Sequence, residues 1–156
     1  MKNIFGLILC FTLAIGFVSC SEDEIPQVEV INVNTSYLNG TWCLSEIDGI
    51  ALEEGTYLYL SFDRKENTFV MYHNLESMYS QRFSGTWSLS EDEDLGMILT
   101  GEYDYDLGEW AAYIATASDA NTLHLVNKEN PEDIRVYTRC ESVPEDIVNG
   151  SRSVQE

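Results

Sequence analysis

Apolar residues alternate with polar ones through most of the chain between residues 37 and 141. The alternation falls into eight short runs, and clusters rich in Gly, Asp, Asn and Ser separate them. The apolar positions are Leu38/Gly40/Trp42/Leu44, Leu58/Leu60/Phe62, Phe69/Met71, Phe83/Gly85/Trp87/Leu89, Met97/Leu99, Trp110/Ala112/Ile114, Leu123/Leu125 and Ile134/Val136. A period of two bounded by turn residues is typical of a strand with one buried face. The pattern therefore predicts eight strands and an all-β domain.

The connections between these runs are short, which makes successive strands antiparallel neighbours. Eight half-buried strands need one shared interior. An eight-stranded antiparallel up-and-down β-barrel provides that interior and leaves no exposed sheet edge. A two-sheet β-sandwich is the alternative. In the barrel, we expect seven bulky side chains to point inward: Trp42, Phe62, Phe69, Met71, Phe83, Trp87 and Trp110.

Five tyrosines fall on the outward positions of this pattern: Tyr57, Tyr59, Tyr72, Tyr113 and Tyr137. They could form an outer face that binds a partner, since Tyr is enriched at interfaces. The simpler interpretation is ordinary pairing of side chains across neighbouring strands.

The first nineteen residues have the organisation of a secretory signal. Lys2 is followed by an uncharged stretch from Ile4 to Val18, which is shorter than the roughly 20 residues of a membrane-spanning helix. The segment then reads Phe17-Val18-Ser19-Cys20, which resembles the lipobox of bacterial lipoproteins. That resemblance implies a signal peptide over residues 1–19 and acyl chains on Cys20 that anchor the protein to a membrane.

Ser21, Glu22, Asp23 and Glu24 come directly after Cys20. This run resembles the acidic export signal of surface lipoproteins of the Bacteroidetes, which implies an outer-membrane protein displayed at the cell surface. The plainer interpretation is a solvated charge run at the start of a tether, which we place at residues 20–36.

Residues 142–156 form a C-terminal tail. Pro144 and two acidic residues after it predict a short helix there, with a frayed end from Ser151 to Glu156.

A seven-residue segment occurs twice. Gly40-Thr41-Trp42-Cys43-Leu44-Ser45-Glu46 recurs 45 residues later as Gly85-Thr86-Trp87-Ser88-Leu89-Ser90-Glu91. The first copy resembles the opening Gly-x-Trp strand of the lipocalin-like lipoproteins of Bacteroidetes. The resemblance implies that Trp42 closes one end of the barrel while a basic residue of the last strand packs across it. Arg139 is our candidate, Arg135 remains open, and Trp87 is grouped with them as barrel-closing.

Charge and motif content narrow the function. The chain has 8 basic and 27 acidic residues, for a net charge of -19. Nucleic-acid binding is excluded, because a phosphate backbone needs clustered Lys and Arg. Glycine loops, nucleophile elbows and zinc-binding helices are missing from the sequence. His73 and His124 suit half-buried structural roles, and the acidic stretch 104–109 departs from a calcium loop at Gly108. We predict no enzyme, metal or cofactor.

Two function classes remain. The barrel could carry a small apolar molecule, or its surface could bind a protein or glycan around a filled interior. An open interior cavity above roughly 300 Å³ would favour the carrier.

Cys43 and Cys140 are the two cysteines of the predicted barrel, in the first and last strands. An oxidising compartment would permit a disulfide between them. Alternation places Cys43 outward and Cys140 with the apolar, inward positions of its strand, which opposes a bridge because both Cβ atoms must lie on one side. A bridge and two free thiols both stay open.

Overall fold

The computed structural model describes residues 31–153. The predicted signal peptide, Cys20 and the run Ser21–Glu24 lie outside the described residues. Ten strands and two short helices make up the described chain. Their bounds, in chain order, are α1 Thr35–Leu38, β1 Gly40–Ile47, β2 Ile50–Ala51, β3 Leu58–Asp63, β4 Thr68–His73, β5 Gln81–Asp92, β6 Gly96–Tyr103, β7 Tyr113–Asp119, β8 Thr122–Asn127, β9 Ile134–Cys140, α2 Glu145–Gly150 and β10 Arg152–Ser153.

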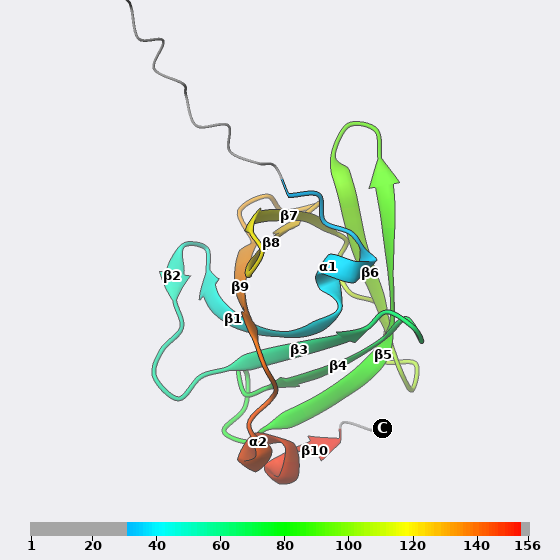
Figure 1. Ribbon diagram of the computed structural model, residues 1–156. Coiled ribbons are helices and arrows are strands. Elements are labelled where there is room, and N and C mark those ends of the chain that lie inside the picture. Colours follow the sequence, from blue (N-terminus) through cyan, green and yellow to red (C-terminus); the bar gives the residue numbers. More distant parts are fainter. Residues whose placement is uncertain (1–30, 154–156) are drawn as a thin grey trace, which may run out of the picture.

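Eight of these strands close into a ring. Antiparallel pairing runs through β1, β3, β4, β5, β6, β7, β8 and β9, and β9 pairs again with β1. The predicted up-and-down barrel is therefore confirmed, and the two-sheet sandwich is not formed. Figure 1 looks into the ring, with α1 lying across its opening. The long β5–β6 hairpin extends beyond the rest of the wall.

The interior is packed with the side chains that alternation placed there. Trp42, Phe62, Phe69 and Trp87 are all at most 4% exposed. Gly85 explains how β5 and β6 come so close, because a Cβ there would stand 2.0 Å from the carbonyl oxygen of Glu102. Large aromatic side chains thus fill much of the barrel.

The direction of side chains in β7 differs from the prediction. Trp110 faces inward as expected, and its backbone N–H donates to the carbonyl oxygen of Gly101 at 2.8 Å. The next paired residues are Leu99 and Tyr113. Between the Gly101–Trp110 contact and this pair, β6 has one residue, whereas the opposite segment has two, Ala111 and Ala112. This extra residue is a β-bulge, and a bulge reverses the alternation that follows it. Tyr113 is consequently buried, and its predicted outward direction is wrong.

The direction of β9 is also the reverse of the prediction. The register pairs Trp42 with Arg139 and Leu44 with Tyr137, so the odd-numbered residues of β9 face the interior. Ile134 is 36% exposed, whereas Tyr137 is buried. The inward face of this strand is polar, and its apolar residues lie outside. Alternation alone therefore assigned the wrong face, and the expected outward position of Tyr137 is wrong.

The same register corrects the placement of the cysteines. Cys140 pairs with Thr41 and Cys43 pairs with Thr138, so both cysteines point to the outer side of the wall. They sit diagonally across the strand pair rather than directly opposite each other, a spacing of about 7–8 Å. Both thiols are free.

The barrel includes more of the tether and tail than predicted. Ile31 bridges to Ala117, and Val33 is buried, although both precede the expected boundary at residue 37. The tail forms the predicted helix, α2, and then β10, which pairs with β5 in parallel. The expectation of a frayed end is therefore wrong for Arg152 and Ser153. Among residues 31–153, no helix has the length and apolar character to cross a membrane.

Candidate functional site

One end of the barrel is closed by α1 and Trp42. The Asn34 side chain begins the helix by accepting hydrogen bonds from the backbone N–H groups of Ser36 and Tyr37, each at 2.9 Å. The helix carries Leu38 into the core, where it is fully buried. Trp42 is also fully buried and donates its Nε1–H to the carbonyl oxygen of Leu38 at 2.8 Å. The indole thus fixes the helix in the opening.

Arg139 completes this end. Its guanidinium lies 4.1 Å from the centre of the Trp42 ring and donates to the carbonyl oxygens of Tyr37 and Asn39. Gly40 has φ +115°, and a Cβ there would approach Nη1 of Arg139 to 3.1 Å. The structure brings Trp42 and Arg139 together, while Arg135, the alternative that the sequence left open, lies elsewhere.

Trp87 lies apart from that pair. Its ring packs edge-on against Phe62 with centroids 5.2 Å apart, and its Nε1–H donates to the carbonyl oxygens of Thr68 at 3.0 Å and Asp63 at 3.3 Å. The two tryptophans of the repeated segment therefore play matching parts. Each is buried and ties its indole N–H to a backbone carbonyl, Trp42 at α1 and Trp87 at the β3–β4 turn.

Trp110 fills the middle of the barrel. It packs against Phe69, with ring centroids 4.4 Å apart, and against Phe62 at 6.1 Å. Gly101 makes room for it, since a Cβ there would lie 2.6 Å from the indole ring. The indole nitrogen of Trp110 is buried without a hydrogen-bond partner. This side chain separates the closed end from the space beyond it.

A cavity of about 180 Å³ lies inside the barrel next to Trp110. Leu60, Met71 and Leu125 form its apolar wall. The hydroxyl-bearing side chains of Tyr103, Tyr113 and Tyr137 and the guanidinium of Arg135 also line it, together with residues 109–111 of the β6–β7 connection. Its volume is below the roughly 300 Å³ that would have favoured the carrier, so the cavity has room only for a very small molecule.

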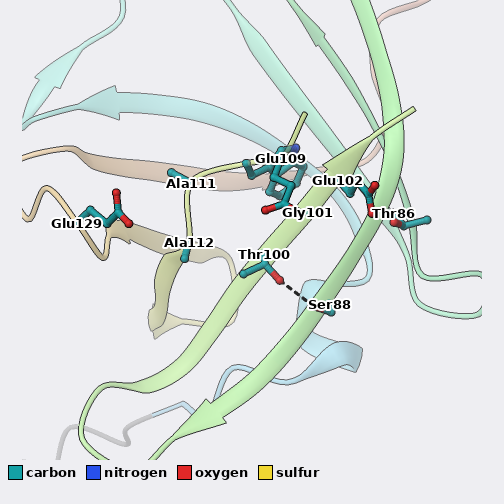
Figure 2. A pocket seen from close by; sticks show the side chains of 10 residues that line it. Thr86, Ser88, Thr100, Gly101, Glu102, Glu109, Ala111, Ala112 and Glu129 are labelled. Atoms are coloured by element: carbon teal, nitrogen blue, oxygen red, sulfur yellow. Dashed lines mark hydrogen bonds between the residues drawn. The ribbon is translucent and has the colours of Figure 1, made fainter. Parts of the chain in front are cut away.

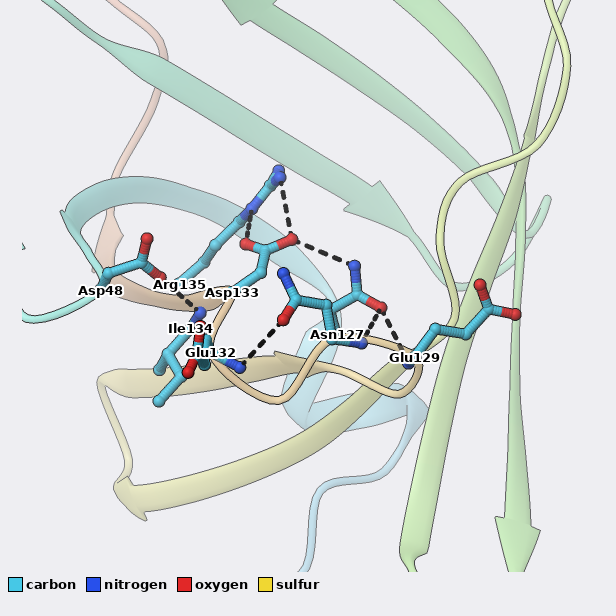
Figure 3. A network of polar contacts seen from close by, with 8 residues as sticks. Asp48, Asn127, Glu129, Glu132, Asp133, Ile134 and Arg135 are labelled. Carbon is cyan, nitrogen blue, oxygen red and sulfur yellow. Dashed lines mark hydrogen bonds and ion pairs between the residues drawn. The ribbon is translucent and has the colours of Figure 1, made fainter.

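Arg135 is the cation of this cavity. Its Nε donates to Asp133 Oδ1 at 3.0 Å, and Nη2 approaches Oδ2 at 3.5 Å. Asn127 donates to the same carboxylate at 3.1 Å, as Figure 3 shows. The Arg135 side chain keeps 32% of its surface exposed, and the guanidinium lies 5.3 Å from the Tyr113 ring centre. It therefore reaches both solvent and cavity.

The pKa shifts agree with a partly dry, donor-rich interior. Burial raises the pKa of Tyr103, Tyr113 and Tyr137, so the three phenols keep their protons at neutral pH. Burial opposes the charge of Arg135, but its pKa is still raised, with the hydrogen bond and ion pair to Asp133 among the causes. The cavity thus presents one permanent cation and several O–H donors.

His73 stands near the same end of the barrel, stacked on Phe83 with ring centroids 5.1 Å apart. Burial lowers its pKa, and its Nδ1 is buried without a partner. The burial agrees with the half-buried role that the sequence predicted for His73, whereas its Nδ1 lacks a hydrogen-bond partner.

A hollow of about 500 Å³ lies on the outside of the barrel. Figure 2 shows its polar lining, which includes Glu102, Glu109 and Glu129 and the hydrogen-bonded pair Ser88 and Thr100. Across residues 31–153, no three His, Cys, Asp or Glu side chains are grouped to hold a metal, the acidic stretch 104–109 included. We place the candidate site inside the barrel, where apolar walls and a half-buried cation converge.

Sequence reasoning missed Arg135, Tyr113 and Tyr137 as residues of the interior. For β9 the sequence did contain the necessary information. Side chains two residues apart in a strand point to the same face, so every second residue from the one that packs on Trp42 also points inward. Placing Arg139 at Trp42 therefore also places Tyr137 and Arg135 inside. The bulge before Tyr113 has no comparable signal in the sequence.

Comparison with known proteins agrees with this architecture. A family model described as "Lipocalin-like domain" matches residues 38–125, from the end of α1 to β8. No curated protein and no solved structure matches the chain. The matched segment covers more than half of the chain and contains the Gly-x-Trp strand, the inward aromatic side chains and most of the cavity wall. The chain therefore belongs to the lipocalin-like domain family.

Proposed function

We propose that the protein binds a small apolar molecule inside its barrel, in a binding rather than a catalytic role. The observation that carries this proposal is the cavity of about 180 Å³ beside Trp110, walled by Leu60, Met71 and Leu125. Eight-stranded barrels have interiors that side chains can just fill or that hold one small ligand. A dry cavity of about 150 Å³ accepts benzene, so the proposed ligand has about the size of one ring or a short chain.

A titration with small apolar molecules tests the proposal. Binding of benzyl alcohol or hexanol should change Trp110 emission and release measurable heat. Leu125→Phe adds bulk to the cavity wall and should weaken binding at least tenfold, whereas Val70→Phe adds bulk at a position of β4 that alternates with the buried Phe69 and Met71, and should not. Equal binding by both variants would contradict the interior site. No binding at millimolar concentrations would favour the surface interaction module.

We also propose that a lipid on Cys20 anchors the protein in the outer membrane. The uncharged stretch that runs directly into Val18-Ser19-Cys20 supports this proposal. Cys20→Ala should release the protein from the membrane fraction, because acyl chains require the sulfur of that residue. Cys10→Ala is the matched control, since Cys10 lies in the predicted signal peptide. Membrane retention of Cys20→Ala would contradict the anchor.

Display at the cell surface is a separate part of the proposal, supported by the acidic run after Cys20. Replacing Glu22, Asp23 and Glu24 by Gln, Asn and Gln should reduce antibody labelling of intact cells at constant total protein. The control replaces three exposed carboxylates of the barrel, Glu53, Glu54 and Glu66, by Gln. Equal labelling of both variants would reduce the run to a tether.

A further inference from the structure

We propose that the interior cavity selects ligands that carry a carboxylate, held by Arg135 with the hydroxyl groups of Tyr113 and Tyr137. This inference rests on the proposed function, because it names the ligand class of the same cavity. It begins from the polar half of the lining, which an apolar ligand alone would leave unused.

Arg135 has donors to spare. A guanidinium carries five N–H donors, and Asp133 takes its hydrogen bonds from Nε and, at the longer distance of 3.5 Å, from Nη2. Asp133 lies just before β9, two residues before Arg135, and also accepts a hydrogen bond from the side chain of Asn127. Arg135 lines the cavity with its guanidinium 5.3 Å from the Tyr113 ring centre, and Tyr137 takes a further side-chain hydrogen bond, which leaves N–H groups without a partner among these residues. A bidentate acceptor such as a carboxylate matches the fork of N–H groups.

The phenols add donors around the same point. Tyr137 is 2% exposed and lines the cavity with Arg135, to which its side chain is hydrogen-bonded, and burial raises its pKa against the opposing influence of Arg135. Tyr113 is 7% exposed and lies under the guanidinium. Both remain protonated at neutral pH and can donate to an acceptor oxygen. A hydroxyl that accepts from the guanidinium still has its own proton to donate, so an oxygen of the ligand can accept from these phenols.

The cavity lining holds one charge of each sign, and Asp133, which does not line the cavity, pairs with Arg135. Among the residues that line it, Arg135 is the cation and Glu109 the carboxylate. Glu109 is exposed on the β6–β7 connection, where water screens it, whereas Arg135 is two-thirds covered. The volume leaves space for one ring or a short chain between Arg135 and the apolar wall. Small aromatic or short-chain monocarboxylic acids therefore satisfy both halves of the lining.

Matched pairs of probes test the inference with the full chain. Benzoate is compared with benzamide, and hexanoate with hexanamide, by calorimetry and Trp emission. Each pair has the same size and differs in charge. We expect the acids to bind at least tenfold more tightly than their amides. Arg135→Gln should remove most of that difference, and Tyr137→Phe should reduce it in part. Arg64→Gln, an exposed arginine near α1, should leave it unchanged.

The outcomes separate the two levels of the proposal. If the amides bind as tightly as the acids and Arg135→Gln changes neither, the interior binds apolar molecules and the carboxylate inference is overturned. If neither acids nor amides bind, the proposed function itself fails and takes the inference with it. Thermal unfolding of each variant, followed alongside, shows that a loss of affinity is not a loss of fold. Partial rescue by Arg135→Lys would add support for charge recognition.

Discussion

Arg135 and Arg139 lie on the same strand, point into the same barrel and stand four residues apart, yet they do different things. Arg139 covers the Trp42 ring and donates hydrogen bonds to backbone carbonyl oxygens around α1. Arg135 pairs with one carboxylate and turns the rest of its guanidinium toward a cavity. The end of the barrel at Arg139 is therefore closed, whereas the end at Arg135, which we call the open end, keeps polar groups available to the cavity.

The closed end should respond most strongly to substitution. Trp42→Ala removes a fully buried indole together with its hydrogen bond to Leu38, and we expect a loss of about 3–5 kcal/mol in the free energy of unfolding. Trp42→Phe keeps most of the bulk and should cost less. Denaturant titration measures both, and a loss below about 1 kcal/mol for Trp42→Ala would contradict a structural role of this end.

Gly101 makes room for Trp110, the side chain that separates the two ends of the barrel. A methyl group there would collide with the Trp110 ring, so Gly101→Ala should cost about 1–3 kcal/mol and shift Trp110 emission. Gly150→Ala is the control, because nothing lies within 4 Å of the added carbon. Similar stability of the two variants would mean that Trp110 does not need this space.

The sequence predicted the closed end better than the open one. The Gly-x-Trp strand identified Trp42, and a basic residue of the last strand followed from the family resemblance. The interior of the other end depends on two features that alternation does not reveal. A single extra residue at Ala111–Ala112 turns Tyr113 inward, and β9 carries its polar residues on the buried face. Alternation indicates which residues prefer water. In β9, however, the pairing of Arg139 with Trp42 turns the polar residues toward the interior.

The open end should show a pH dependence through His73. Burial lowers the pKa of this imidazole below its unfolded value near 6.5, so the unfolded chain binds the extra proton first. Its contribution to stability is therefore complete above about pH 6.5 and declines as the pH falls through that value toward the lower folded pKa. His73→Phe should flatten the dependence of unfolding on pH between 7 and 5. An unchanged slope would mean that His73 is hydrated.

The outer wall beside Arg139 should be insensitive by comparison. Cys43 and Cys140 are free and diagonal, so Cys43→Ser should lower the number of reactive thiols in denatured, unreduced protein by one, with little change in stability. If the two were bridged, the same substitution would release Cys140 and raise the number by one.

The contrast between the two ends is tested most directly by measuring stability and benzoate affinity in Arg135→Gln and Arg139→Gln. Arg139→Gln should cost about 2–3 kcal/mol of stability, because charged hydrogen bonds to carbonyl oxygens are lost, and leave the affinity within about twofold. Arg135→Gln should cost about 1 kcal/mol or less, as for a partly exposed ion pair, and lower the affinity at least tenfold. If the two substitutions lower stability and affinity in the same proportion, the division of the barrel into a closed and a binding end is wrong.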